Sequence, residues 1–177
     1  SGAVPDLDTV NVRKAYPSTL HVEISLRPLV ARLRIADPEQ ELAVGTGASI
    51  DFLTEGGVYV ATVSALDTDT LPEIIIVDWG ARPSPGTKLL DTAFIQRLNA
   101  AEVVLLRQFG QEVTQRIVYL RGQEFHLRLS GGPVLWFDMR SSFEDQMQRY
   151  RIFLAEVGLD QVNEYVDLRI EGRVLYK

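Results

Sequence analysis

The sequence predicts an α+β fold, with a largely antiparallel mixed β-sheet, two helices and a preceding β-hairpin. Short runs of alternating apolar and polar residues, the pattern of strands with one buried face, recur along the chain. Residues 87–107 and 142–157 instead carry apolar residues at three- and four-residue steps, as amphipathic helices do. Strands and helices occur in separate runs rather than in strict alternation, which favours α+β over a parallel α/β sheet.

The expected strands are separated by turn residues. Tyr16-Pro17-Ser18 joins the first two strands, and Pro28 separates the second from the third or bends it. Thr54–Gly57 is a strong hairpin turn, and Gly131-Gly132 is another turn. The segments expected as strands are 9–13, 20–26, 29–35, 49–52, 58–63, 73–77, 112–120, 124–129, 134–139 and both halves of 165–177.

Both expected helices have recognisable ends. Thr87 is the expected N-cap of the first, and Gly110 its stop. Ser141 is the expected cap of the second, with Glu144 reaching back to it and Gly158 in a left-handed conformation beyond its end. The buried stripes are expected at Leu90, Phe94, Leu98, Ala101 and Leu105, and at Phe143, Met147, Tyr150, Leu154 and Val157.

The final stretch, Tyr165–Lys177, reads YVDLRIEGRVLYK and consists of two alternating runs around a Glu171-Gly172 turn. Val166, Leu168 and Ile170 are expected on a buried face, and Tyr165, Asp167 and Arg169 on a wet face. A chain-terminal strand often lies at a sheet edge with unpaired N–H and C=O groups, so this stretch is either a plain edge or a docking site.

Bulk composition narrows the functional classes. The chain has 177 residues, enough for a real core, and a net charge of −6 without a cluster of basic residues, which argues against a nucleic-acid partner. It has no cysteine, which excludes disulfides and thiolate chemistry. No apolar run is long enough to span a bilayer. A start at Ser1-Gly2 rather than Met indicates a cut chain, so the absence of a membrane segment here is no evidence against one upstream.

No set of side chains suggests catalysis, a cofactor or a metal site. His21 and His126 are both expected on polar strand faces as surface residues. Asp67-Thr68-Asp69 lacks the rest of a calcium loop, and Gly45-Thr46-Gly47 lacks the rest of a phosphate loop. Trp136 is expected in the core. We therefore expect a non-enzymatic protein.

Three ordered stretches together resemble one family, the bacterial division proteins FtsQ/DivIB. Val10–Leu33, containing YPSTLHVEISLRPLVARL, resembles the end of that family's POTRA domain. Gly47–Tyr59, followed by Leu71-Pro72, is similar to the family's Ile-Asp-x-x-Gly hairpin and the Leu-Pro strand after it. Tyr165–Lys177 resembles the closing Tyr-Val-Asp-Leu-Arg segment. Arg27–Ala31 differs from the family's signature by one extra residue after Pro28, and Leu26 lies where the family commonly has an acidic residue.

The resemblance implies a fold and a place in the cell. Residues 1–33 would be the C-terminal part of a POTRA-like domain, and 34–177 the FtsQ/DivIB-type β domain. The protein would be anchored by one membrane helix, absent here, with both domains on the extracytoplasmic face of the cytoplasmic membrane. It would be a non-enzymatic scaffold of the division complex that binds FtsB/DivIC-like and FtsL-like proteins and helps to control septal peptidoglycan synthesis.

The resemblance also implies a binding site. In the family, a partner adds a strand to the last strand of the β domain. Here the corresponding partner-binding residues are Ile170, Gly172, Arg173, Val174, Leu175 and Tyr176. The last four depart from better-known members, so the backbone mode transfers better than the side-chain contacts do. The alternative is that this strand simply completes the sheet.

Two other functions remain open. The chain could be a POTRA-like binding module of an outer-membrane assembly or secretion system, although tandem POTRA repeats would be expected there. It could also be an enzyme acting on cell-wall polymers, which would need paired carboxylates in one cleft.

Overall fold

The computed structural model describes residues 7–36, 51–61, 70–77, 80 and 83–177. Within these residues it contains two helices and two β-sheets, which confirms the predicted α+β class. The predicted strand segments 49–50 and 62–63, the loops at Gly45-Thr46-Gly47 and Asp67-Thr68-Asp69, and Trp79 lie outside the described residues.

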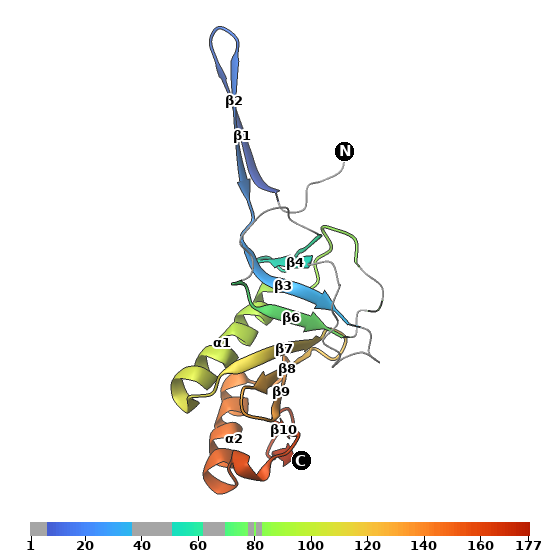
Figure 1. Ribbon diagram of the computed structural model, residues 1–177, viewed down its shortest axis with the longest axis vertical. Coiled ribbons are helices and arrows are strands. Elements are labelled where there is room, and N and C mark those ends of the chain that lie inside the picture. Colours follow the sequence, from blue (N-terminus) through green and yellow to red (C-terminus); the bar gives the residue numbers. More distant parts are fainter. Residues whose placement is uncertain (1–6, 37–50, 62–69, 78–79, 81–82) are drawn as a thin grey trace.

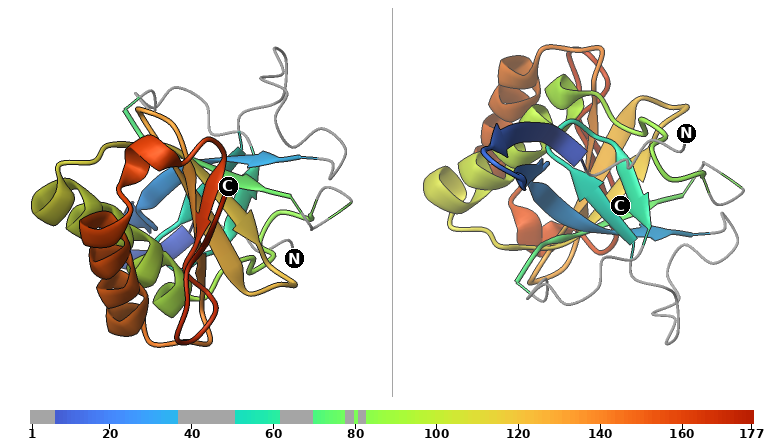
Figure 2. Two further views of the ribbon diagram at one scale, coloured as in Figure 1. Left: turned by 90° about the horizontal axis from the view of Figure 1, so that it is seen from below. Right: turned by 90° about the horizontal axis from the view of Figure 1, so that it is seen from above.

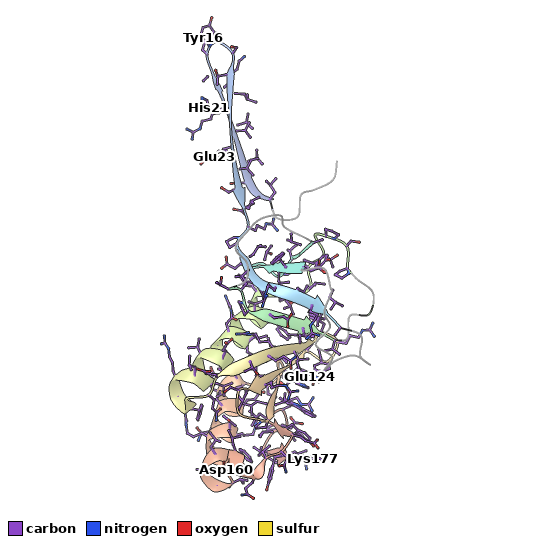
Figure 3. The ribbon with its side chains drawn as sticks, in the orientation of Figure 1. Tyr16, His21, Glu23, Glu124, Asp160 and Lys177 are labelled. Atoms are coloured by element: carbon purple, nitrogen blue, oxygen red, sulfur yellow. The ribbon has the colours of Figure 1, made fainter. Side chains whose placement is uncertain are left out.

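The first sheet is a hairpin that projects from the rest of the molecule (Figure 1). Strands β1 (Leu7–Ala15) and β2 (Thr19–Leu26) pair antiparallel, as predicted, with Val12 opposite Val22. Tyr16 lies at the tip, at the far end of the molecule from Lys177 (Figure 3). Apolar side chains along one face of this hairpin are about half exposed: Val10, Val12, Leu20, Val22, Ile24 and Leu26.

The second sheet has nine described strands in the order β11-β10-β9-β8-β7-β6-β3-β4-β5. It is mixed, because β3–β6, β6–β7 and β9–β10 are parallel pairs and the other pairs are antiparallel. Its strands are β3 (Leu29–Ile35), β4 (Asp51–Thr54), β5 (Tyr59–Ala61), β6 (Glu73–Ile76), β7 (Val113–Tyr119), β8 (Glu124–Leu129), β9 (Val134–Asp138), β10 (Tyr165–Asp167) and β11 (Leu175–Tyr176).

The break between the two sheets lies at Arg27 and Pro28. β3 begins directly after them and belongs to the larger sheet, where Ala31 and Leu33 are only 1% and 3% exposed. Residue 33, the predicted end of the POTRA-like part, therefore falls inside β3.

Helices α1 (Thr92–Phe109) and α2 (Phe143–Glu156) pack on the same side of the larger sheet (Figures 1 and 2). The predicted stripe of α1 is buried throughout, including Leu98, Ala101 and Leu105 at 0% exposure. The predicted stripe of α2 is buried at Met147 and Tyr150 but only half-buried at Phe143, Leu154 and Val157, and the unpredicted Gln146 and Phe153 are buried. A short 3₁₀ helix, Leu159–Gln161, connects α2 to β10.

Two predicted helix starts are wrong, and both errors have a local cause. α1 begins at Thr92 with Asp91 as N-cap, because the residues around Thr87 pair with β5 instead. The cap of α2 is Ser142, whose Oγ accepts a hydrogen bond from the N–H of Asp145 at 3.3 Å, whereas Ser141 bonds to Asp138. The predicted end of α1 is confirmed, because Gly110 is left-handed with φ of 66° and ψ of 24°. Gly158 follows α2 with a positive φ of 81°, but its ψ of 161° is extended rather than left-handed helical, so the predicted conformation is wrong there.

Candidate docking edge

The candidate site is the outer edge of β11 together with the adjoining surface of α2. β11 is the terminal strand of the larger sheet, as predicted for the end of the chain. It is shorter than predicted: only Leu175 and Tyr176 are strand residues, paired with Asp167 and Val166 of β10. Residues 170–173 form a turn, in which Gly172 has a φ of 72° and the N–H of Arg173 donates to Ile170 O. The predicted turn at Glu171-Gly172 is therefore confirmed, but the strand on which the partner site was expected does not extend over 170–174.

The direction of the backbone groups on this edge follows from the neighbouring ladder. In β10, Val166 is directed toward β9, since Glu164 O accepts from Val134 N and Leu168 N donates to Trp136 O. Because strand residues alternate in direction, Tyr165 and Asp167 are the residues that bond to the β11 side. Tyr176 lies opposite Val166, so its own N–H and C=O point away from the sheet. The edge thus offers a donor and an acceptor to an added strand.

The far end of β11 is tied to β10 by its backbone. The N–H of Lys177 donates to Tyr165 O at 3.1 Å, and Lys177 O accepts from the N–H groups of Asn163 and Glu164 at 2.8 and 2.7 Å. The ammonium of Lys177 also lies 2.8 Å from a carboxylate oxygen of Glu164. These bonds order the strand while leaving its outer side open.

A groove of about 360 Å³ lies between α2 and the closing segment. Tyr176 forms one wall, with its ring 5.3 Å from that of Phe153, and both Tyr176 and Ile152 are 47% exposed. The groove is lined by Arg149, Ile152, Phe153, Glu156, Val157, Gly172, Arg173, Val174 and Tyr176. Its exposed apolar rim beside an open strand edge is a surface suited to apolar side chains of an extended peptide.

The predicted site residues do not all meet at this groove. Gly172, Arg173, Val174 and Tyr176 line it, and Val174 also packs partly buried against the main core. Leu175, 41% exposed, points to the opposite face of the strand, and the half-buried Ile170 does not line the groove. The α2 residues were missed because only one helical stripe was sought. The run Ile152-Phe153-Leu154, wider than a stripe, was the available signal.

On the sheet face away from the helices, aromatic rings form a ladder across β7 to β10. His126, Trp136 and Tyr165 stack in turn, with ring centroids 4.8 and 4.2 Å apart, and Tyr119 lies tilted against His126 with its centroid 4.6 Å away. Trp136 is half-buried rather than in the core, as one rung of this ladder.

His126 is buried, and the prediction of a surface histidine is wrong for it but right for the exposed His21. Burial, followed by the positive charge of Arg169, lowers the pKa of His126 to about 3. The ring is therefore neutral at pH 7, so its contact of 3.6 Å with Glu124 is not an ion pair. Within the described residues, His126 Nε2 has no hydrogen-bond partner.

The prediction of a wet face at Tyr165, Asp167 and Arg169 is wrong, because Asp167 is buried and the other two are half-buried. A charge cluster lies there instead, which we call the clasp: Glu124, Asp167 and Arg169. Asp167 is only 3% exposed and accepts from Nε and Nη2 of Arg169 at 2.9 and 2.7 Å. Arg169 also pairs with Glu124 and lies over the Trp136 ring, 4.8 Å from its centroid. Burial alone would raise the pKa of Asp167, but the Arg169 hydrogen bonds outweigh it and hold that pKa below its ordinary value.

Three cavities lined by described residues, the docking groove among them, each have a single carboxylate in their lining: Glu23, Glu156 or Asp160. Hydrolysis of a glycan by the common mechanism needs two. In the same described part of the chain, no group of three or more His, Asp or Glu residues is placed to hold a metal ion.

Comparison with protein-family models and with curated proteins finds no match to this chain. None of the helices in the described ranges is both long and apolar enough to cross a membrane.

Proposed function

We propose that the chain is the extracytoplasmic part of a bacterial division scaffold of the FtsQ/DivIB type, which binds an FtsB/DivIC-like partner by strand addition to β11. The observation that carries the proposal is the outward-facing backbone of Tyr176 beside an apolar groove, within the stretch that resembles the family's closing segment. The same resemblance supports a single-pass anchor in the cytoplasmic membrane and an FtsL-like second partner.

The proposed binding mode uses both features of the edge. The partner strand exchanges hydrogen bonds with the N–H and C=O of Tyr176, which supplies orientation. Its alternate side chains then face the groove between α2 and β11. Because β11 is only two residues long, few backbone bonds are available, and apolar burial must supply much of the affinity.

The size of that contribution can be estimated. Completing the burial of a large side chain that is already half buried contributes about 1 kcal/mol, half of the usual value for a full side chain. Ile152 and Tyr176, each 47% exposed, would together contribute about 2 kcal/mol. Losing both contacts should weaken binding about thirtyfold.

The test compares Ile152→Glu with Val103→Glu, since Val103 is an equally exposed residue (48%) on α1, away from the groove. Binding to the extracytoplasmic part of the FtsB/DivIC-type protein from the same organism is measured by calorimetry. We expect Ile152→Glu to weaken binding at least tenfold, through lost contact and a buried charge, and Val103→Glu to leave it unchanged. Failure of the unaltered chain to bind, or equal loss in both variants, would overturn the proposal.

A second candidate, a POTRA-like module that pairs strands with client proteins, is favoured by the hairpin. Its exposed aliphatic face and its long strands would suit strand pairing at β1 or β2 rather than at β11. The variant Val12→Glu with Val22→Glu separates the two candidates. The division scaffold keeps its FtsB/DivIC-type partner at full affinity in this variant, whereas the client-binding module loses its clients.

A further inference from the structure

The clasp of Glu124, Asp167 and Arg169 lies directly inside the docking edge. Asp167 pairs with Leu175 of β11, so the Leu175 side chain and the clasp share one face of the sheet. Arg169 then connects three neighbouring strands, because it bonds to Asp167 of β10, covers Trp136 of β9 and pairs with Glu124 of β8.

The clasp also fixes the start of the turn that leads to β11. The backbone N–H of Arg169 donates to Asp167 Oδ1 at 3.0 Å. From the helix side, Nε and Nη2 of Arg149 donate to Leu168 O at 3.1 and 2.8 Å. The backbone at 167–169 is therefore held from both faces of the sheet, immediately before the turn at 170–173.

β11 needs such support because its own pairing is short. Only its two paired residues and the backbone bonds of Lys177 join β11 to β10, and a strand that moves before binding costs affinity when it is ordered. The guanidinium of Arg169 has a fixed planar fork, so it constrains the direction of Asp167 in a way that a single ammonium would not.

We propose that Arg169 is a positioning residue for the docking edge: through the clasp it holds β11 in place for the incoming partner strand. The expected effect of Arg169 on partner affinity rests on the proposed function, whereas its effect on the order of β11 concerns the free protein alone. Arg169 does not itself line the groove.

The experiment replaces the whole clasp with neutral side chains, as Glu124→Gln, Asp167→Asn and Arg169→Met together. Removing all three charges avoids leaving the buried Asp167 unpaired, which would threaten the fold. The matched control is Glu102→Gln with Arg116→Met, which neutralises a comparable ion pair between α1 and β7, away from β11. Arg169→Lys is the third variant, keeping the charge but not the fork.

Two quantities are measured for every variant: hydrogen exchange of the Lys177 amide in the free chain, and affinity for the FtsB/DivIC-type partner used above. Trp136 emission is a third, measured for the clasp variant and the control. We expect the clasp variant to exchange this amide about tenfold faster and to bind about tenfold more weakly, while the control changes neither. Arg169→Lys should also exchange this amide faster and bind more weakly than the unaltered chain, by less than the clasp variant does. Trp136 emission in a Trp79→Phe background should change in the clasp variant and not in the control.

The outcomes separate the two proposals. The positioning role is overturned if exchange at Lys177 is unchanged in the clasp variant. It is also overturned if Arg169→Lys equals the unaltered chain in both exchange and affinity. If the unaltered chain does not bind the partner, the proposed function fails, but faster exchange at Lys177 still supports the clasp as the support of this edge. If exchange accelerates while partner affinity stays unchanged, positioning for binding is wrong.

Discussion

The two edges of the nine-stranded sheet are treated in opposite ways. At β5, the chain covers its own edge: Tyr59 N donates to Thr87 O at 2.8 Å, Gly86 N to Tyr59 O at 2.9 Å, and Leu89 N to Gly57 O at 2.8 Å. At β11, the strand is fastened at its ends, while the backbone of Tyr176 faces outward. Covering an edge and keeping an edge strand very short are both ways in which proteins limit edge-to-edge association. The proposed partner binding rests on the outward backbone of Tyr176, which the two-residue β11 leaves uncovered.

The largest expected effect tests the closed edge. In Gly57→Ala, the new Cβ would lie 1.8 Å from Leu90 O, at a residue with a φ of +75°, so the covering segment must move. We expect a loss of about 3 kcal/mol in the free energy of unfolding, measured by urea denaturation. Gly131→Ala, where no heavy atom lies within 4 Å, is the control and should be close to neutral.

Acid should loosen the β11 half of the sheet through His126. Its folded pKa of about 3 lies below the ordinary 6.5, so the unfolded chain takes up a proton that the folded chain does not. Stability therefore falls as pH drops below 6.5, by about 1 to 2 kcal/mol between pH 7 and 5. The lowered pKa of Asp167 adds a further loss of stability only below about pH 4.

His126→Gln should flatten this pH dependence, and His21→Gln, on the exposed hairpin, should leave it unaltered. Urea denaturation at pH 7, 6 and 5 measures both slopes. Equal slopes in the unaltered chain and in His126→Gln would contradict the account of His126 as a buried neutral ring beside Glu124, Asp167 and Arg169.

Proline tests the open edge directly. Tyr176→Pro removes an N–H that faces outward, a change that edge strands tolerate. Because Tyr176→Pro and Tyr176→Thr both lose the ring contact with Phe153, the two variants should be about equally stable. Tyr176→Thr removes the ring and keeps the N–H. We expect Tyr176→Pro to bind the partner about tenfold more weakly than Tyr176→Thr, the value of one lost backbone bond at the interface. Equal affinities would place the partner elsewhere than on this edge.

The smallest expected effect concerns Lys177. Its ammonium and the Glu164 carboxylate are both largely exposed, and surface ion pairs contribute little to stability. Lys177→Met should therefore leave the unfolding midpoint and the exchange rate of the Lys177 amide unchanged, because the backbone bonds to β10 remain.

Local patterning was enough to predict most of the fold. Alternation located β1, β2, β3 and β8, and helical spacing located both helices. It failed where long-range pairing decides the outcome. Thr87 has the chemistry of a helix cap, yet it pairs with β5, a strand that ends 26 residues earlier (87 − 61).

The site could be predicted only in part, because local patterns locate strands but do not specify long-range contacts. The position of the last strand at an edge could be predicted from its alternation and its place in the chain. The burial of Asp167 and His126 could not, because it depends on Arg169, Trp136 and Glu124 meeting across three strands. The groove also required α2 to pack beside β11, which no local pattern specifies.

The proposed function depends above all on strand addition at β11. Amide hydrogen exchange at Tyr176, measured with and without the FtsB/DivIC-type partner, tests it most directly, with Tyr59 of the covered edge as internal reference. We predict exchange at Tyr176 to slow at least tenfold on binding while Tyr59 is unaffected. Binding that protects the hairpin or α1 and leaves Tyr176 unchanged would contradict the account.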